Sequence, residues 1–110
     1  VAVHDAARPF VTREIIEATI LSAEEHGSGV ISTPVTDTIK EVDPDGSVTT
    51  PDRARLFAVQ TPQSFRLPLL LAAHERASRE NYIATDDAAL IAQRAGAGRL
   101  EADGREDLYL

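Results

Sequence analysis

Two hydrophobic spacings alternate along the chain, one typical of buried strands and one typical of amphipathic helices. Short apolar runs predict strands, and apolar positions three and four residues apart predict helices. Because a strand, a helix and a second strand in that order form a right-handed parallel crossover, the alternation favours an α/β fold with a mainly parallel sheet. The predicted strands are 1–3, 29–35, 56–60, 98–102 and 108–110, and the predicted helices are 13–26, one opening at 67 and one opening at 85.

Local signals mark the ends of the predicted helices. Thr12 is a candidate N-cap with Glu14 in the first turn, and Gly27 follows the last residue of that helix. Pro68 suits the first position of the second helix, and Thr85 is the candidate N-cap of the third. These residues predict three helices with defined starts.

Residues 38–50 depart from this pattern. A loosely alternating stretch is followed by the turn signal Pro44-Asp45-Gly46 and a short return, which together predict a hairpin. A hairpin of mostly polar and charged residues cannot supply its own core, and an isolated two-stranded ribbon is marginal in water. It therefore either lies on its own domain or extends to a partner, and the residues alone leave both open.

The first ten residues end a predicted strand in a turn with ligand-binding chemistry. Asp5 stands at the carboxyl end of the strand, where open α/β sheets bind ligands. Ala6 and Ala7 leave room for a phosphate or a metal ion, and the planar fork of Arg8 suits a phosphate or a carboxylate. The alternative is structural: Asp5 caps the turn, with Arg8 as its surface partner.

Three polar features elsewhere each have a structural and a functional interpretation. The hydroxyl of Thr61, held extended by the following proline, either faces a ligand or belongs to an ordinary turn at the sheet rim. Asp86 and Asp87 suit the positive end of a helix and could also bind a metal ion, capping being the commoner use. His74 falls on or beside an apolar helix face, which favours a packed side chain over a ligand.

Composition limits the classes of function. The net charge of −7 argues against non-specific nucleic-acid binding, which needs a basic surface. The absence of cysteine excludes disulfides and thiolate metal sites. No apolar run reaches membrane-spanning length, so we expect a cytoplasmic protein without a membrane partner. At 110 residues, starting directly in a buried-type strand, the chain is expected to be a partial domain.

Five motifs give a more specific indication when taken together. The motifs are VHDAARP at 3–9, PVTDTIK at 34–40, DR at 52–53, QTPQSF at 60–65 and TDDA at 85–88. Their order and spacing resemble those of the 2-C-methyl-D-erythritol 4-phosphate cytidylyltransferases of non-mevalonate isoprenoid biosynthesis, from residue 1 to about residue 104.

The resemblance implies a Rossmann-like nucleotidyltransferase fold, of which residues 1–110 form the C-terminal part of a single domain with a protruding β-arm at about 36–55. It implies transfer of a cytidylyl group from CTP to methylerythritol phosphate, with release of pyrophosphate and with Mg²⁺ as the cofactor. It also implies a homodimer in which the arm crosses to the neighbouring subunit.

The same resemblance implies roles for residues of the first strand end and of the TPQ motif. Asp5 helps to bind Mg²⁺ and orients the substrate, Ala6 lies against nucleotide and substrate, and Arg8 lies near the methylerythritol phosphate. Thr61 adds a hydroxyl to the same pocket.

Two residues of the arm are implied to complete the site of the other subunit. Thr38 contributes to substrate binding there, and Arg53 is the catalytic residue that holds the attacking phosphate in line. A fixed guanidinium fork suits that task better than a flexible ammonium group. The structural alternative for Arg53 is a surface pair with Asp52 or Glu41.

Two departures from the family pattern keep alternatives open. The family's glycine-rich loop, with its arginine and lysine, and its cytosine-recognising segment belong before Val1. No lysine matches the one expected near the last strand, where Arg105 is a candidate substitute. The alternatives are a ribitol-5-phosphate cytidylyltransferase, which shares the fold and an HDAARP-like motif, an inactive dimerisation module, and a sugar-phosphate-binding protein without catalysis.

Overall fold

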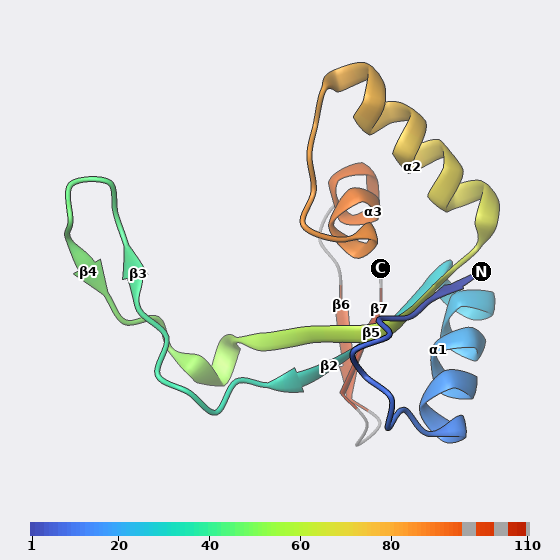
Figure 1. The fold of residues 1–110 in the computed structure, drawn as a ribbon, viewed down its shortest axis with the longest axis horizontal. Helices are drawn as coiled ribbons and strands as arrows, with labels where there is room; N and C mark the ends of the chain where they lie inside the picture. Colours follow the sequence, from blue (N-terminus) through green and yellow to red (C-terminus); the bar gives the residue numbers. More distant parts are fainter. Residues whose placement is uncertain (96–98, 103–105, 110) are drawn as a thin grey trace.

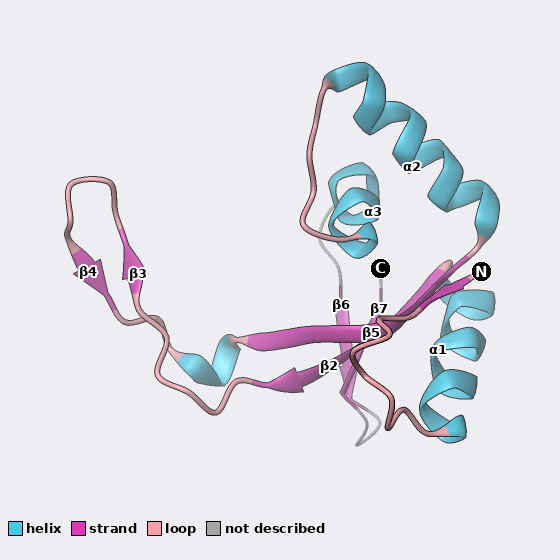
Figure 2. Ribbon diagram, viewed as in Figure 1, coloured by secondary structure: helices cyan, strands magenta, loops and turns pink. Residues whose placement is uncertain are grey.

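A five-stranded sheet forms the centre of the molecule, with strands in the order β1-β5-β2-β7-β6 (Figure 1). This computed structural model describes residues 1–95, 99–102 and 106–109. The strands of this sheet are β1 (Ala2–Val3), β2 (Ser28–Pro34), β5 (Phe57–Phe65), β6 (Arg99–Ala102) and β7 (Glu106–Tyr109). The helices are α1 (Arg13–His26), α2 (Leu67–Glu80) and α3 (Asp87–Ala95), so the predicted α/β class is confirmed (Figure 2).

The predicted mainly parallel sheet is wrong for the described residues, where every strand pairing is antiparallel. β1 and β2 do run in the same direction, as a strand–helix–strand unit requires, but β5 lies between them. β5 runs opposite to both, with Ser64 facing Ala2 and Gln63 facing Val30. β5 is antiparallel to β2 because the chain returns from β2 to β5 through a hairpin arm, whereas a parallel neighbour would need a crossover such as a helix.

β5 is longer than the pattern of apolar residues predicts. The apolar run 56–60 predicts a strand that ends at Thr61-Pro62, whereas the structure continues it as nine residues to Phe65. The register with β2 shifts between Val30 and Ser32, and this irregularity accommodates Pro62, which has no amide hydrogen to donate. The TPQ motif therefore lies inside the sheet and not in a turn at its rim.

Successive residues of β5 contact helices on opposite faces of the sheet. The Ser64 hydroxyl lies 2.9 Å from the Thr19 hydroxyl of α1. Phe65, which is 1% exposed, belongs instead to the core cluster with Leu70 of α2 and Ile91 of α3. α1 thus covers one face and the pair of α2 and α3 covers the other.

Most of the predicted helix ends are confirmed. The hydroxyl of Thr12 accepts the amide hydrogen of Ile15 at 3.3 Å, and Gly27 ends α1 with a positive φ of 99°. α2 carries its proline in the first turn. The predicted N-cap of α3 is wrong by one residue: the carboxylate of Asp86, not the Thr85 hydroxyl, accepts the amide hydrogen of Ala89 at 2.8 Å. Asp86 is one residue nearer the helix, where a carboxylate reaches the amide three residues on.

Residues 36–55, here called the arm, project away from the rest of the molecule (Figure 1). They contain the hairpin of β3 (Glu41–Val42) and β4 (Val48–Thr49) and the short 3₁₀ helix η1 (Arg53–Arg55). Val42 and Val48 are 64% and 57% exposed, so the hairpin has no core of its own. Of the two alternatives that the sequence leaves open, the structure supports extension over packing on its own domain.

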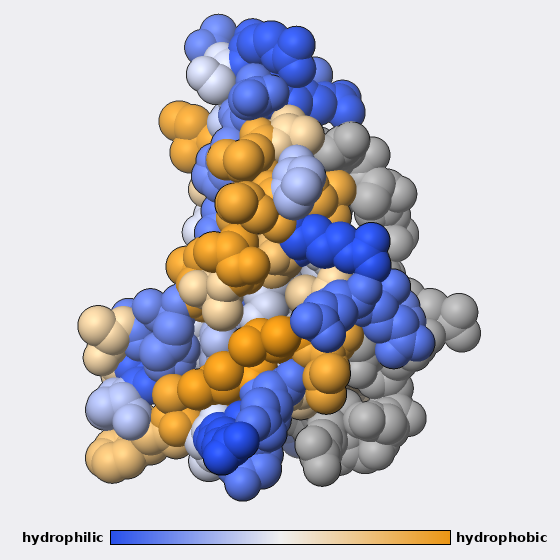
Figure 3. All heavy atoms as spheres, turned by 90° about the vertical axis from the view of Figure 1, so that its right-hand side faces the viewer, coloured by the Kyte–Doolittle hydropathy of each residue, from blue (hydrophilic) through white to orange (hydrophobic). Residues whose placement is uncertain are grey.

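The side of the molecule formed by α1 and α2 also exposes apolar side chains (Figure 3). Leu67 and Leu71 lie four residues apart on α2, share one helix face and are 51% and 54% exposed. They lie outside the core cluster, which uses Leu70 and Ala73 of the same helix.

Candidate functional site

The loop after β1 folds into a tight turn around Asp5. Its carboxylate Oδ1 accepts the amide hydrogen of Ala7 at 3.0 Å, and its carbonyl oxygen accepts the amide hydrogen of Arg8 at 3.0 Å. Among the described residues no hydrogen bond reaches Oδ2 of Asp5, and the amide of Ala6 has no acceptor. The turn therefore presents one carboxylate oxygen and one amide hydrogen to a ligand.

Thr61 and His4 connect this turn to β5. The amide of Asp5 donates to the Thr61 hydroxyl oxygen at 2.9 Å, and the same oxygen lies 3.2 Å from Nδ1 of His4. Nε2 of His4 lies 2.9 Å from the carbonyl oxygen of Arg8, at the far end of the turn. Asp5, Arg8 and Thr61 are thus brought together as the sequence predicts, and His4 belongs to the same group.

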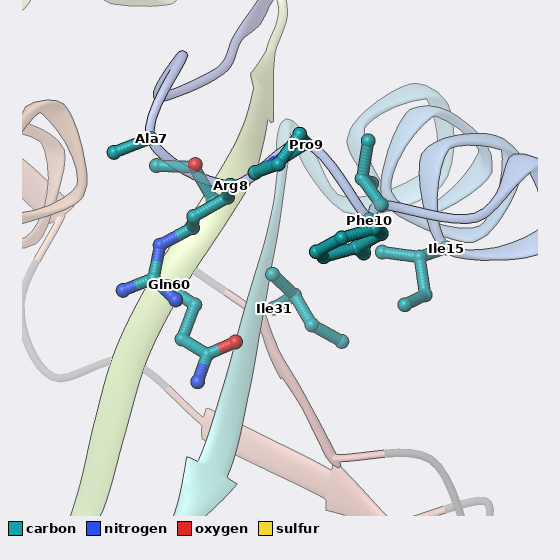
Figure 4. Close-up of a pocket in the computed structure, with 9 residues that line it drawn as sticks. Ala7, Arg8, Pro9, Phe10, Ile15, Ile31 and Gln60 are labelled. Carbon is teal, nitrogen blue, oxygen red and sulfur yellow. The ribbon is translucent and has the colours of Figure 1, made fainter.

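A cavity of about 520 Å³ opens beside this turn (Figure 4). Arg8 and Gln60 lie on one side of it, and Phe10, Ile15 and Ile31 lie on the other. The guanidinium of Arg8 has no ion-pair partner among the described residues, so it is available to an anionic ligand. The cavity combines a cationic wall with an apolar wall, which suits a phosphorylated organic molecule.

Sequence reasoning missed three residues of this site. Gln60 opens the QTPQSF motif, and His4 lies inside the HDAARP motif. Both positions were therefore indicated by a motif, but the motif did not predict what either side chain contacts. Phe10 follows the motif directly and is 93% exposed. Its position in the cavity wall depends on the path of the loop, which no local pattern reports.

A second cavity, of about 320 Å³, lies on the α3 side of Thr61 and is also lined by Gln63 and Asp86. Nε2 of Gln63 donates to Asp86 Oδ2 at 3.1 Å, and Oε1 of Gln63 accepts the amide hydrogen of Ala88 at 3.3 Å. These contacts assign Asp86 to helix capping. Because the side chain of Gln63 is bonded at both ends, it joins β5 to the start of α3.

The histidine of α2 differs from its prediction. The His74 side chain is 54% exposed and its Nε2 lies 2.8 Å from the Asp87 carboxylate, so it is a surface partner of α3 and not a packed side chain. Within the described ranges there is no group of three or more His, Asp or Glu side chains that could hold a metal ion.

The arm residues lie apart from the turn within one chain. Arg53 is in η1 at the base of the arm, and its Nη1 donates to the carbonyl oxygen of Thr36 at 2.7 Å (Figure 1). Thr38 is exposed on the adjoining segment. One chain therefore brings together Asp5, Ala6, Arg8 and Thr61 but does not bring Thr38 and Arg53 to them. Arg105 lies outside the described residues.

The tip of the arm carries a perturbed carboxyl group. Hydrogen bonds from the side chain and the amide of Ser47 lower the pKa of Asp45 below its ordinary value of 3.8. The hydroxyl and the amide donate to Asp45 Oδ1 at 2.7 Å and 2.9 Å. The turn is therefore held by an ionised carboxylate at neutral pH.

Residues 1–108 match the family model of 2-C-methyl-D-erythritol 4-phosphate cytidylyltransferase. The chain belongs to this family. The family that the motifs indicate is therefore confirmed.

Curated relatives agree with the family assignment. A bifunctional enzyme IspD/IspF of Bradyrhizobium sp. is 50% identical over 97 residues, which are 87% of this chain and 25% of that protein. The 2-C-methyl-D-erythritol 4-phosphate cytidylyltransferase of Bacillus mycoides is 47% identical over 96 residues, 87% of this chain and 42% of that protein. The chain spans less than half the length of these cytidylyltransferase-family relatives.

Solved structures of cytidylyltransferases support the fold. The Thermus thermophilus enzyme aligns with a TM-score of 0.76 and 37% identity over 86% of this chain and 46% of its own. The 4-diphosphocytidyl-2C-methyl-D-erythritol synthase of Anaerococcus prevotii aligns with a TM-score of 0.78 and 33% identity over 86% of this chain and 43% of its own. The nucleotidyltransferase fold is thereby confirmed. In the described part of the chain no helix is long and apolar enough to cross a bilayer.

Proposed function

We propose that the protein that carries this chain transfers a cytidylyl group from CTP to 2-C-methyl-D-erythritol 4-phosphate. The family match over residues 1–108 carries this proposal. In the reaction, a phosphate oxygen of the acceptor attacks the α-phosphorus of CTP. The bond from that phosphorus to the oxygen bridging to the β-phosphate then breaks, and pyrophosphate leaves. Such transfers depend mainly on alignment and on neutralising charge.

The turn at residues 5–8 supports the binding of the acceptor phosphate. The amide of Ala6 and the guanidinium of Arg8 both lack a partner among the described residues, and both donate hydrogen bonds to anions. The neighbouring apolar wall with Phe10 and Ile31 suits the carbon skeleton of the acceptor.

The same turn fits a magnesium ion. Mg²⁺ is commonly held by one or two carboxylates together with waters and substrate phosphates, and not by a cage of protein ligands. Asp5 supplies one such carboxylate, and its Oδ2 receives no hydrogen bond from the described residues. When bound, the ion would neutralise negative charge on the phosphates.

The arm supports a homodimeric site. Because the arm extends away from its own domain (Figure 1), a second copy is the natural recipient of Thr38 and Arg53. We infer that Arg53 of one copy aligns the attacking phosphate bound at Asp5, Ala6 and Arg8 of the other. Its present bond to the carbonyl oxygen of Thr36 occupies one guanidinium nitrogen, so other N–H groups remain for the phosphate.

The test is pyrophosphate release by the whole protein that carries this chain. We expect release only when CTP, Mg²⁺ and methylerythritol phosphate are all present, and loss of release when EDTA is added. Ribitol 5-phosphate is the competing acceptor. A kcat/KM for ribitol 5-phosphate equal to or above that for methylerythritol phosphate would reject the proposed acceptor.

Arg53→Ala tests the role of the arm in that reaction. We expect kcat/KM for methylerythritol phosphate to fall about a hundredfold or more, because loss of an aligning contact costs that much in a positioned transfer. Arg55→Ala, in the same 3₁₀ helix, removes the same charge and serves as the matched control. Turnover of Arg53→Ala within about threefold of the unmodified protein would contradict the assignment, since alignment effects are larger.

A further inference from the structure

The hydrogen bonds between β5 and the turn form a one-way series. The carbonyl oxygen of Arg8 can only accept, so Nε2 of His4 must carry the hydrogen that lies between them. In a neutral imidazole Nδ1 is then an acceptor, and the Thr61 hydroxyl donates to it. The Thr61 oxygen in turn accepts the amide hydrogen of Asp5. Every donor in the series has one acceptor.

We propose that His4 is a positioning residue that, through Thr61, holds the turn at residues 5–8 in its substrate-binding conformation. The identity of the substrate rests on the proposed function, whereas the hydrogen-bonded arrangement does not. His4 joins the far end of the turn, at Arg8, to the Thr61 hydroxyl that also binds its near end, at Asp5.

The turn needs this support because its other hydrogen bonds are local. All residues from 4 to 10 are exposed, and the bonds from the amides of Ala7 and Arg8 to Asp5 stay within the turn itself. Thr61, by contrast, stands in β5 next to the buried residues Pro62 and Gln63. Fixing both ends of the turn to that strand sets the direction of the Asp5 carboxylate and of the Ala6 amide.

The proposal changes the role expected for Thr61. While its hydroxyl hydrogen is bonded to His4, Thr61 cannot donate it to a substrate phosphate. Its effect on turnover then passes through the conformation of the turn. His4 and Thr61 should therefore behave as one unit, and removal of either should have the same consequence.

Three single substitutions and one double variant test this in the whole protein. His4→Phe keeps a ring and removes both nitrogens, while Thr61→Val keeps the shape and removes the hydroxyl. We expect each to raise KM for methylerythritol phosphate about tenfold, to leave KM for CTP within about twofold, and the double variant to be little worse than either single one. Thr61→Ser keeps the hydroxyl, so its KM for methylerythritol phosphate should lie within about threefold of that of the unmodified protein.

The control and the overturning results follow from the same assay. His26→Phe, an equal change at the end of α1, should leave both KM values unchanged. A His4→Phe variant with KM within about twofold of the unmodified protein would overturn the proposal, because a positioning contact has a larger effect. So would a strong effect of Thr61→Val that is absent in His4→Phe, since Thr61 would then act on the substrate directly.

A measurement without substrate separates this proposal from the proposed function. In ¹⁵N spectra we expect His4 to show a protonated Nε2 and an unprotonated Nδ1, and amide hydrogen exchange at Asp5 to speed up about tenfold or more in Thr61→Val. The opposite tautomer, or unchanged exchange at Asp5, would overturn the positioning role. If the expected tautomer and the faster exchange in Thr61→Val are both observed but the protein releases no pyrophosphate, the proposed reaction is rejected and the positioning role stands.

Discussion

At the scale of single residues, Gln63 and Asp86 are polar side chains beside the site that are hydrogen-bonded through each of their polar atoms. Gln63 is 5% exposed and bonded at both ends of its amide. Asp86 shares its two oxygens between Gln63 and the amide of Ala89. A fully satisfied buried group of this kind stabilises its arrangement, and a partly satisfied one is costly.

Gln63→Leu tests this buried contact. We expect a loss of about 1–3 kcal/mol in the free energy of unfolding, because the amide of Ala88 and one oxygen of Asp86 lose their partner. The measurement is urea unfolding at neutral pH. Gln60→Leu, at a less buried position of the same strand, is the control. A loss for Gln63→Leu no larger than for the control would show that the contact contributes nothing.

The tip of the arm gives a prediction about pH. The pKa of Asp45 is lowered in the folded hairpin by the Ser47 hydroxyl and amide. The bonds therefore stabilise the turn fully above the ordinary value of 3.8, and this stabilisation is lost as the pH falls through the folded value. Ser47→Ala should raise the pKa of Asp45 toward 3.8, which an NMR titration of its carboxyl carbon measures. An unchanged titration would contradict the role of the hydroxyl.

At the scale of elements, the close packing of α1 on β2 depends on a missing side chain. A Cβ at Gly29 would lie 2.2 Å from the carbonyl oxygen of Thr19 and 2.7 Å from the Cβ of Ser22. Both neighbours are on α1, so α1 can lie this close to the sheet only where the strand has a glycine. The position of α1 matters to the site because the loop from β1 leads directly into it.

Gly29→Ala should therefore destabilise the protein. We expect a loss of about 1–3 kcal/mol in the free energy of unfolding, since backbone of α1 must move to admit the methyl group. Gly46→Ala is an informative comparison, because a Cβ there meets nothing and only the positive φ of 86° opposes it. Thermal unfolding of both variants measures the difference. Equal losses would show that the contact with α1 is not the cause.

Sequence reasoning succeeded for elements with local signals and failed where strands meet. The cap at Thr12 and the turn around Gly46 are encoded within a few residues, and both are found. The continuation of β5 past Pro62 was missed because a proline normally ends a strand, and here an irregular register accommodates it. The neighbours of β5 depend on contacts distant in the sequence, which local patterns do not report. For the same reason His4 was recognised as part of a motif but not as a partner of Thr61.

At the scale of the whole molecule, the arm and the domain have different surfaces. The domain has a core cluster that includes Val30, Phe65 and Ile91, whereas the arm exposes Val42 and Val48. Lys40 and Thr50 are joined by a hydrogen bond of 2.6 Å where the hairpin begins and ends, so the hairpin is held as a unit. An extended ribbon without a core is stabilised when it packs on another surface.

Deletion of residues 40–50 tests whether that surface belongs to a second copy. We expect the protein to sediment as a dimer and the deletion variant to sediment as a monomer, because the exchanged contacts are removed. The matched control is Leu67→Ser with Leu71→Ser, which removes the apolar pair on α2 and leaves the arm intact. A dimer that survives the deletion, or one that the α2 substitutions alone dissociate, would contradict an arm-mediated assembly.

Two parts of the site are attached to β5 at positions only two residues apart. This spacing limits where such proteins can gain or lose residues during evolution. Thr61 binds the turn and Gln63 binds the start of α3, and both line the same cavity. Adding or removing one residue between them would turn one of the two side chains to the opposite face of the sheet. The tip of the arm has no such neighbour, since Gly46 has open space around it. Insertions and deletions should therefore accumulate at the hairpin tip in natural variants and be absent between residues 61 and 63.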